Sequence, residues 1–434
     1  MTFSSIIFLY FFLPLSLLCH NLVPVRWKNS VLLTASLIFF AWSKPVLLLI
    51  LPLYILIVYL LGIILERQDI EAYRKVVAAA GMAFSLIPLL QELFCTEISL
   101  YLRAAAALIT IHSITYLAEI YRRESRAQAS FAALGVYLIM FPRALAGPVT
   151  HYNDLRPALA RRSVDTERAA DGILRFCIGL GKKVLLADRL YALWAQIDAT
   201  SAPGAAAEWL GIGAFCLATW LGFSGYCDMA IGLGDLFGFD FPENFFYPLA
   251  ALSIREFYRR WNATLFSWMR DHVTEPLCGK KPSRTAVVMI LSTVLAAFFY
   301  GGHPTLLLWG LYAGLLLAGE YFLWGRFLEK MPRFVRRVIT LLLILIGCIF
   351  FSAESFPDVI HGFAALVGLN GHGLGQAFYL VGSYWLVLLL AICSVNHWPR
   401  TLWMKLIDRF PALQQWFRPA AILVLLTCCT AYLI

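Results

Sequence analysis

Charged residues are scarce in this sequence. Of its 434 residues only 14% are charged, whereas 61% are hydrophobic and the mean hydropathy is +0.74. Soluble domains typically contain about 25% charged residues and about 45–50% apolar ones. The shortage of charge therefore excludes an ordinary soluble domain and predicts a protein embedded in a lipid bilayer.

Cysteine motifs are missing as well. None of the ten cysteines forms a Cys-x-x-Cys pair, and Cys216, Cys348 and Cys393 lie within apolar runs. Cysteines in such positions usually act as small buried hydrophobic side chains. We expect neither a disulfide framework nor a metal site, and no glycine-rich phosphate loop or Ser-His-Asp arrangement occurs.

The sequence also lacks a Gly/Ser-rich linker, a low-complexity tract and a detectable internal repeat. We therefore interpret residues 1–434 as a single membrane-embedded domain. The missing repeat counts against a transporter, because many transporters contain paired repeats with broken helices. The net charge of +9 is dispersed in short basic pairs between apolar runs. This distribution is typical of cytoplasmic loops and does not predict nucleic-acid binding.

Long uncharged runs are abundant, and several reach the ~20 residues that a spanning helix needs. They include residues 46–65, 209–227, 286–319 and 359–399. These runs are too long for barrel strands, so the fold class is all-α. We expect about eleven transmembrane helices, the first of them within residues 1–25. The basic residues Arg26 and Lys28 predict a cytoplasmic loop after it, with the N-terminus outside.

Residues 225–284 mix carboxylates, arginines and aromatic residues between two apolar blocks. Ser253 and Glu256 have the spacing of a capping box at a helix start. An aromatic and aliphatic stripe follows at helical spacing, formed by Phe257, Trp261, Leu265 and Trp268. We expect one amphipathic interfacial helix here. It is either a lipid anchor or a cytosolic floor whose arginines bind an anionic acyl donor.

The same segment resembles the alginate O-acetylase branch of the membrane-bound O-acyltransferase family. That branch carries Tyr-Ser-Asp-Met-Ala-Ile-Gly, an Asn-Phe-Pro-like step, Arg-Glu-Phe-Trp-Arg-Arg-Trp-His and Trp-Leu-Arg-Asp. The corresponding stretches of this chain are Tyr226-Cys227-Asp228-Met229-Ala230-Ile231-Gly232, Asn244-Phe245-Phe246-Tyr247-Pro248, Arg255-Glu256-Phe257-Tyr258-Arg259-Arg260-Trp261-Asn262 and Trp268-Met269-Arg270-Asp271. Further similarity, such as Phe141-Pro142-Arg143-Ala144-Leu145-Ala146-Gly147-Pro148, extends the resemblance over most of the chain.

This resemblance implies a multi-pass plasma (inner) membrane enzyme that moves an acyl group from a cytosolic thioester to a hydroxyl group. The donor would be acetyl-coenzyme A or an acyl carrier protein, with no tightly bound cofactor. An extracytoplasmic acyltransferase would be the partner that modifies a cell-surface polysaccharide. We expect the donor-binding residues to be Tyr226, Asp228, Arg255, Arg259 and Trp261. Asp228 would form an ion pair with Arg255 or Arg259.

The chain departs from the family pattern at two positions that concern catalysis. Asn262 replaces the histidine after Arg-Arg-Trp, and Tyr300 replaces the presumed catalytic histidine. His303 follows three residues later, before Pro304, which predicts a helix break. We predict catalytic roles for His303, Asn262 and Tyr300, with His303 as the base that takes the hydroxyl proton. The alternatives are an inactive or acyl-binding relative with Tyr300 as a structural substitute, and a structural role for His303.

These residues are compatible with four functions. The preferred one is O-acyl transfer, with acetyl as the acyl group, and the second is D-alanyl transfer to teichoic acid. A non-catalytic scaffold is the third, and a transporter that relays ions through Asp228 and His303 is the fourth. For His112 and His151 a structural role is expected, although both could line a cavity.

Overall fold

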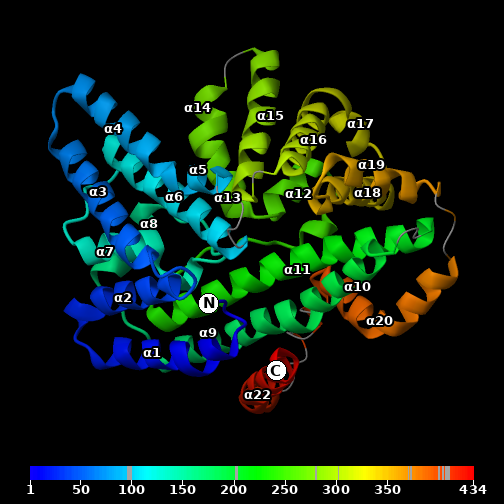
Figure 1. Ribbon diagram of the computed structural model, residues 1–434, viewed down its shortest axis with the longest axis horizontal. Coiled ribbons are helices and arrows are strands. Elements are labelled where there is room, and N and C mark those ends of the chain that lie inside the picture. The colour runs from blue at the N-terminus through cyan, green and yellow to red at the C-terminus, as the bar shows by residue number, and fades with distance from the viewer. Residues whose placement is uncertain are drawn as a thin grey trace. The chain divides into compact units, whose positions relative to one another are not determined.

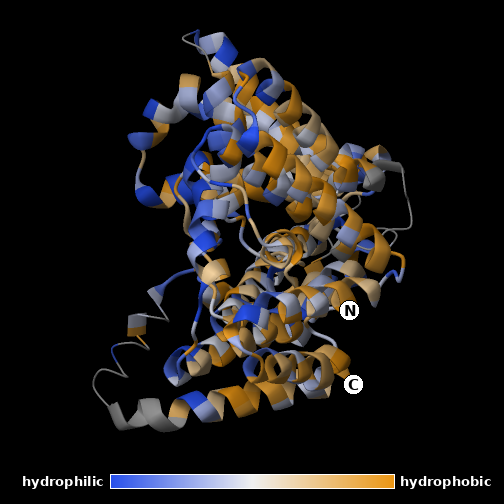
Figure 2. Cartoon of the chain, turned by 90° about the vertical axis from the view of Figure 1, so that its left-hand side faces the viewer, coloured by the Kyte–Doolittle hydropathy of each residue, from blue (hydrophilic) through white to orange (hydrophobic). Residues whose placement is uncertain are grey.

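The computed structural model describes residues 1–94, 100–200, 204–278, 281–301, 303–369, 371, 374–398, 401–402, 405 and 411–434. In these residues all regular structure is helical (Figure 1). The predicted all-α class is therefore confirmed. Hydrophobic residues run along the helices, while hydrophilic ones gather at many of their ends and in loops (Figure 2).

Within the described part of the chain, eight helices are long and apolar enough to cross a membrane. They are Leu47–Arg67, Glu71–Leu90, Leu102–Tyr121, Ala205–Phe237, Pro282–Phe299, Pro304–Glu329, Arg333–Ser352 and Leu374–Ser394. Three shorter apolar helices accompany them, at Phe8–Leu22, Phe131–Arg143 and Phe417–Leu433. The chain is thus a polytopic membrane protein, and the count of about eleven spans stays a prediction.

The chain divides into two compact units. The first unit comprises Met1–Gly179, Tyr226–Pro242 and Leu433, and the second comprises Leu180–Gly225, Glu243–Tyr432 and Ile434. The long helix α11 (Ala205–Phe237) contributes residues to both. Whether the units act as the single domain expected from the sequence stays a prediction.

The first unit is built from α1 (Leu13–Leu22), α2 (Lys28–Ala41), α3 (Leu47–Arg67), α4 (Glu71–Ser85), α5 (Ile87–Phe94), α6 (Leu100–Tyr121), α7 (Phe131–Ile139), α8 (Tyr152–Ala160), α9 (Thr166–Gly181) and the C-terminal part of α11. Helix α2 packs on α7, and α4 packs on α6. A cluster of buried phenylalanines fills the core, and Phe39 lies at its centre with Phe3, Phe8 and Phe141 around it. Such aromatic pairs stabilise a core beyond the area that they bury.

The second unit contains α10 (Asp188–Asp198), α12 (Ile254–Arg260), α13 (Ala263–Met269), α14 (Glu275–Leu277), α15 (Pro282–Phe299), α16 (Pro304–Gly319), α17 (Gly325–Glu329), α18 (Arg333–Ser352), α19 (Phe356–Leu366), α20 (Leu374–Ser394) and α22 (Pro411–Leu433). Helices α15 and α16 form an antiparallel pair (Figure 1). Gly310 and Gly314 of α16 face α15 closely enough that an added Cβ would lie 2.8 Å from Thr293 O and 2.6 Å from Ile290 Cα. These glycines let the two backbones approach, as small residues do in membrane helices.

The predicted amphipathic helix is not continuous. It is divided into α12 and α13, because Asn262 between them adopts the left-handed conformation with φ of 44°. The stripe of Phe257, Trp261, Leu265 and Trp268 is buried within the protein. The interfacial-anchor interpretation is therefore wrong for this face, which packs against protein and not against lipid headgroups.

Candidate active site

The break between α12 and α13 is held by backbone hydrogen bonds. Asn262 is one of the residue types that tolerate a left-handed backbone. The amide of Ala263 donates to the Asn244 carbonyl at 2.9 Å, and that of Phe246 donates to the Arg260 carbonyl at 3.0 Å. The turn therefore fixes the backbone from which Trp261 and Asn262 extend.

A chain of side-chain amides leads from this turn to Tyr300. The backbone amide of Thr264 donates to Asn244 Oδ1 at 3.0 Å, which fixes which end of the Asn244 amide is the oxygen. Asn244 Nδ2 then donates to Asn262 Oδ1 at 2.9 Å. Asn262 Nδ2 in turn donates to Tyr300 Oη at 2.7 Å. Each amide orients the next, so the phenol oxygen receives a directed hydrogen bond.

A second donor reaches the same oxygen. Trp261 Nε1 lies 3.3 Å from Tyr300 Oη and donates to it. A phenol oxygen that accepts two hydrogen bonds can act as a donor only through its own O–H. Asn262, Trp261 and Tyr300, all predicted from the sequence, are thus brought together.

Aromatic rings enclose this cluster. The Tyr300 ring makes edge-to-face contacts with Trp309, Phe351 and Phe223 at centroid distances of 5.6, 5.7 and 5.8 Å. Trp261 stacks on Phe257. An apolar surrounding of this kind strengthens the electrostatic effect of each donor, since little water screens it.

His303 lies between α15 and α16, directly before the first residue of α16. It is the exposed N-cap residue of α16, with an extended backbone before Pro304 at the first helical position. The helix break predicted at residue 303 is confirmed, and Pro304 accounts for it. The catalytic role of His303 stays a prediction.

Two of the predicted donor-binding arginines line a cavity of about 410 Å³ in the second unit, together with Arg270. Arg255 lies 3.6 Å from the buried carboxylate of Glu320, and Arg270 pairs with Asp271 at 2.8 Å. Arg259 is exposed on the same wall. Glu320 and Asp271 offset the charges of Arg255 and Arg270, so the capacity of this wall to bind an anion rests mainly on Arg259.

A second, smaller cavity of about 40 Å³ lies in the same unit and is apolar. Trp261, Trp309 and Phe351 line it, so it adjoins the Tyr300 cluster. Tyr258 lines both cavities. Burial raises the pKa of Tyr258 well above its ordinary value, so this wall presents a neutral phenol.

Asp228 and Tyr226 belong to the first unit. Asp228 accepts from Arg175 Nη2 at 3.0 Å, so the predicted pairing with Arg255 or Arg259 is wrong. Arg175 lies in α9, fifty-three positions before Asp228. Sequence patterns do not indicate a contact between residues so far apart. The buried Tyr226 ring lies 6.2 Å from that of Phe3.

Glu320 is a residue that the sequence interpretation missed. Its Oε2 accepts from the backbone amides of Ile254 at 2.7 Å and Arg255 at 3.3 Å, which caps the N-terminus of α12. Ser253 also accepts from Glu256 N at 3.1 Å, as predicted, but the Glu256 carboxylate binds Leu252 N. The only sequence signal was a carboxylate at the end of an apolar run.

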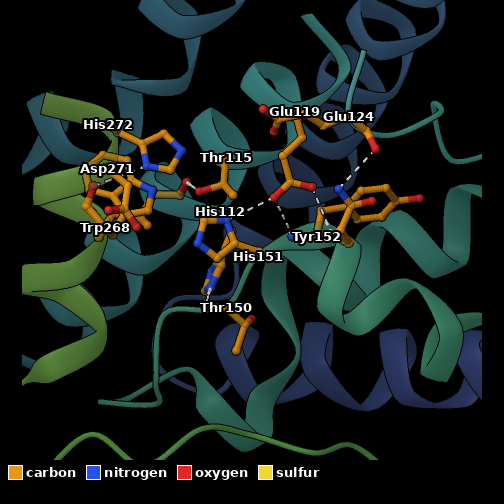
Figure 3. A network of polar contacts seen from close by, with 12 residues as sticks. His112, Thr115, Glu119, Glu124, Thr150, His151, Tyr152, Trp268, Asp271 and His272 are labelled. Atoms are coloured by element: carbon orange, nitrogen blue, oxygen red, sulfur yellow. Dashed lines mark hydrogen bonds and ion pairs between the residues drawn. The ribbon is translucent and has the colours of Figure 1, made fainter. Parts of the chain in front are cut away.

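A further polar cluster occupies the first unit (Figure 3). Glu119 of α6 accepts from the amides of Tyr152 and Asn153 at 3.1 and 3.0 Å and contacts His151 Nδ1 at 3.2 Å. The carboxylate therefore caps the N-terminus of α8. These contacts fit the structural role expected for His151.

The chain matches the model of the MBOAT, membrane-bound O-acyltransferase, family over residues 34–356. It belongs to this family. It is an O-acyltransferase. This finding favours the enzyme over the transporter and the non-catalytic scaffold. That Tyr300 occupies the position of the family's catalytic histidine stays a prediction.

Several named relatives are similar over most of the chain. A Pseudomonas aeruginosa protein named "Probable alginate O-acetylase AlgI" is 31% identical over 387 residues, which are 82% of this chain and 72% of the relative. A peptidoglycan O-acetyltransferase of Helicobacter pylori is 27% identical over 86% of this chain and 81% of its own length. A teichoic acid D-alanyltransferase of Bacillus subtilis is 25% identical over 51% of this chain and 61% of its own.

Proposed function

We propose that this O-acyltransferase moves an acetyl group from a cytosolic thioester to a hydroxyl group, for modification of a cell-surface polysaccharide. The names of the most similar relatives support acetyl as the acyl group. The enzyme works in the plasma (inner) membrane and passes the group to an extracytoplasmic acyltransferase partner. The donor is acetyl-coenzyme A or an acetylated carrier protein.

The observation that carries the proposal is the hydrogen-bonded trio of Trp261, Asn262 and Tyr300. Attack on a thioester places negative charge on the acyl oxygen, and a donor held in advance stabilises that charge. Tyr300 is such a donor, since Trp261 and Asn262 already occupy its oxygen as hydrogen-bond donors. In this role Tyr300 is a neutral hydrogen-bond donor and not the base.

The reaction also needs a proton acceptor. The acceptor oxygen forms a bond to the acyl carbon, the carbon–sulfur bond breaks, and the hydroxyl proton ends on the departing thiolate. His303 is the proposed carrier of that proton, because a neutral imidazole suits the task near pH 7. It lies three residues after Tyr300 in the sequence.

The arginine-lined cavity supports the proposed donor. Coenzyme A and carrier-bound phosphopantetheine both carry phosphate, and arginine binds phosphate with two parallel hydrogen bonds. Arg255 and Arg259 lie on the cavity wall beside Tyr258. We propose that they hold the donor phosphate while the acyl end reaches towards Tyr300.

Inverted membrane vesicles from cells that make the polysaccharide test the function directly. With ¹⁴C-acetyl-coenzyme A or a ¹⁴C-acetylated carrier protein outside, we expect label to enter the polysaccharide as esters that mild alkali releases. Vesicles without this enzyme are the control. Equal labelling with and without the enzyme would contradict the proposal.

A further inference from the structure

The apolar cavity beside Tyr300 is small. Its volume of about 40 Å³ lies between that of a site for one water molecule, about 10–15 Å³, and a cavity of about 150 Å³ that holds benzene. By this comparison it holds two or three heavy atoms. An acetyl group has three.

The walls of this cavity limit its size from several sides. Trp309 and Phe351 contribute rings, and their centroids lie 5.4 Å apart at 80°. At Gly347 an added Cβ would lie 3.3 Å from Tyr312 Cε1, which leaves little room there. Close packing of this kind does not yield to an added methylene without cost.

The chemistry of the walls also limits the charge that can enter. The lining residues are apolar, aromatic, thiol or hydroxyl side chains, and none of the described ones is charged. An ammonium group would lose its hydration there without a carboxylate to replace it. A D-alanyl group carries such an ammonium at neutral pH.

Tyr258 connects this cavity to donor binding. Its side chain lines the apolar cavity on one side and the arginine-lined cavity on the other. Tyr258 is thus a wall that the arginine-lined cavity and the apolar cavity share.

We propose that the apolar cavity formed by Trp261, Trp309, Phe351 and Gly347 selects a short, uncharged acyl group, and so accepts acetyl over longer acyl groups and over D-alanyl. This inference rests on the proposed function, because it takes the cavity as the seat of the transferred group. It assigns the specificity to Phe351 and Gly347.

The test compares acetyl-, butyryl- and D-alanyl-4′-phosphopantetheine as donors to the full-length enzyme. We expect acetyl to be transferred about tenfold or more faster than either competitor, since one methylene in a hydrophobic pocket changes rates by about that factor. Phe351→Ala should raise butyryl relative to acetyl, and Gly347→Ala should lower butyryl further. Phe327→Ala, which removes an exposed ring of α17, is the matched control and should leave the ratio unchanged.

A binding measurement distinguishes a failure of the proposed function from a failure of the cavity inference. Ketone analogues of the acetyl and butyryl donors, with methylene in place of the thioester sulfur, should quench tryptophan fluorescence, and the acetyl analogue should bind more tightly. If transfer occurs at equal rates for both lengths, the cavity inference is wrong and the function stands. If no acyl group is transferred but the analogues follow the size order, the proposed function is wrong and only the size selection in binding stands. Failure of both readouts overturns both.

Discussion

Asn262 has two roles, one through its backbone and one through its side chain. Its backbone adopts the left-handed conformation that ends α12, and its side chain holds Tyr300. Other residues with a Cβ pay about 1–2 kcal/mol for that backbone, whereas asparagine and glycine adopt it readily. Asn262 thus supplies both the turn and a hydrogen-bond donor.

Two variants of Asn262 separate these properties. Asn262→Gly keeps the turn and removes the donor, so we expect near-normal thermal stability and a fall in acyl transfer. Asn262→Asp keeps the shape and can still accept from Asn244, but cannot donate to Tyr300. Circular dichroism in detergent measures stability, and the vesicle assay measures transfer. Full activity in both variants would show that the donor has no role.

Helix α12 depends on a carboxylate from another element. Glu320 accepts from two backbone amides at the start of α12 and lies near Arg255. A buried donor left without its partner costs about 1–3 kcal/mol. We expect Glu320→Ala to lower the melting temperature and to weaken transfer, because α12 carries Trp261 at its C-terminal end.

The isosteric change Glu320→Gln is the control for this cap. It keeps an oxygen acceptor for the backbone amides and loses only the attraction to Arg255, which is partly exposed. Its melting temperature should lie between those of the native enzyme and Glu320→Ala. Equal stability of all three proteins would mean that the cap contributes nothing.

The α15–α16 pair depends on two glycines that are one helical turn apart. An added Cβ at Gly310 or Gly314 would come within 2.8 or 2.5 Å of Thr293 atoms, closer than packed atoms allow. We therefore expect Gly310→Ala and Gly314→Ala each to lower the melting temperature. Gly213→Ala in α11 meets nothing within 4 Å and should be neutral or slightly stabilising. Destabilisation of all three alike would contradict the packing argument.

The first unit of the molecule has its own ion pair within apolar surroundings. Asp228 and Arg175 join α11 to α9. Removal of Asp228 takes a counter-ion from Arg175, so Asp228→Ala should lower thermal stability. The double variant Asp228→Ala/Arg175→Ala should lose less stability than the two single variants lose in sum. If Asp228 bound the donor instead, its loss would raise the KM for acetyl-coenzyme A without lowering stability.

The sequence predicts much of the whole molecule from composition and order alone. Membrane embedding, the all-helical fold and the family follow from apolar runs and from residues 226–271. Asn262, Tyr300 and Trp261 are predicted as site residues from their motif positions, and the structure shows that they contact one another. These features are predictable because each depends on residues that are close together in the sequence.

The parts that the sequence could not predict depend on contacts between distant residues. The pairing of Asp228 with Arg175 and the capping of α12 by Glu320 join positions 53 and 66 residues apart. The break at Asn262 also overrides a helical periodicity that continues across it. Tertiary packing decides such features, and periodicity carries no signal for them.

The central claim is that Tyr300, held by Asn262 and Trp261, stabilises the reacting acyl group. Acetyl transfer by Tyr300→Phe tests it most directly, because this change removes only the hydroxyl group, with His303→Ala measured beside it. We predict that Tyr300→Phe retains its fold and loses transfer by about 10²–10³-fold, as expected for removal of one such donor. Native rates in Tyr300→Phe would contradict the claim.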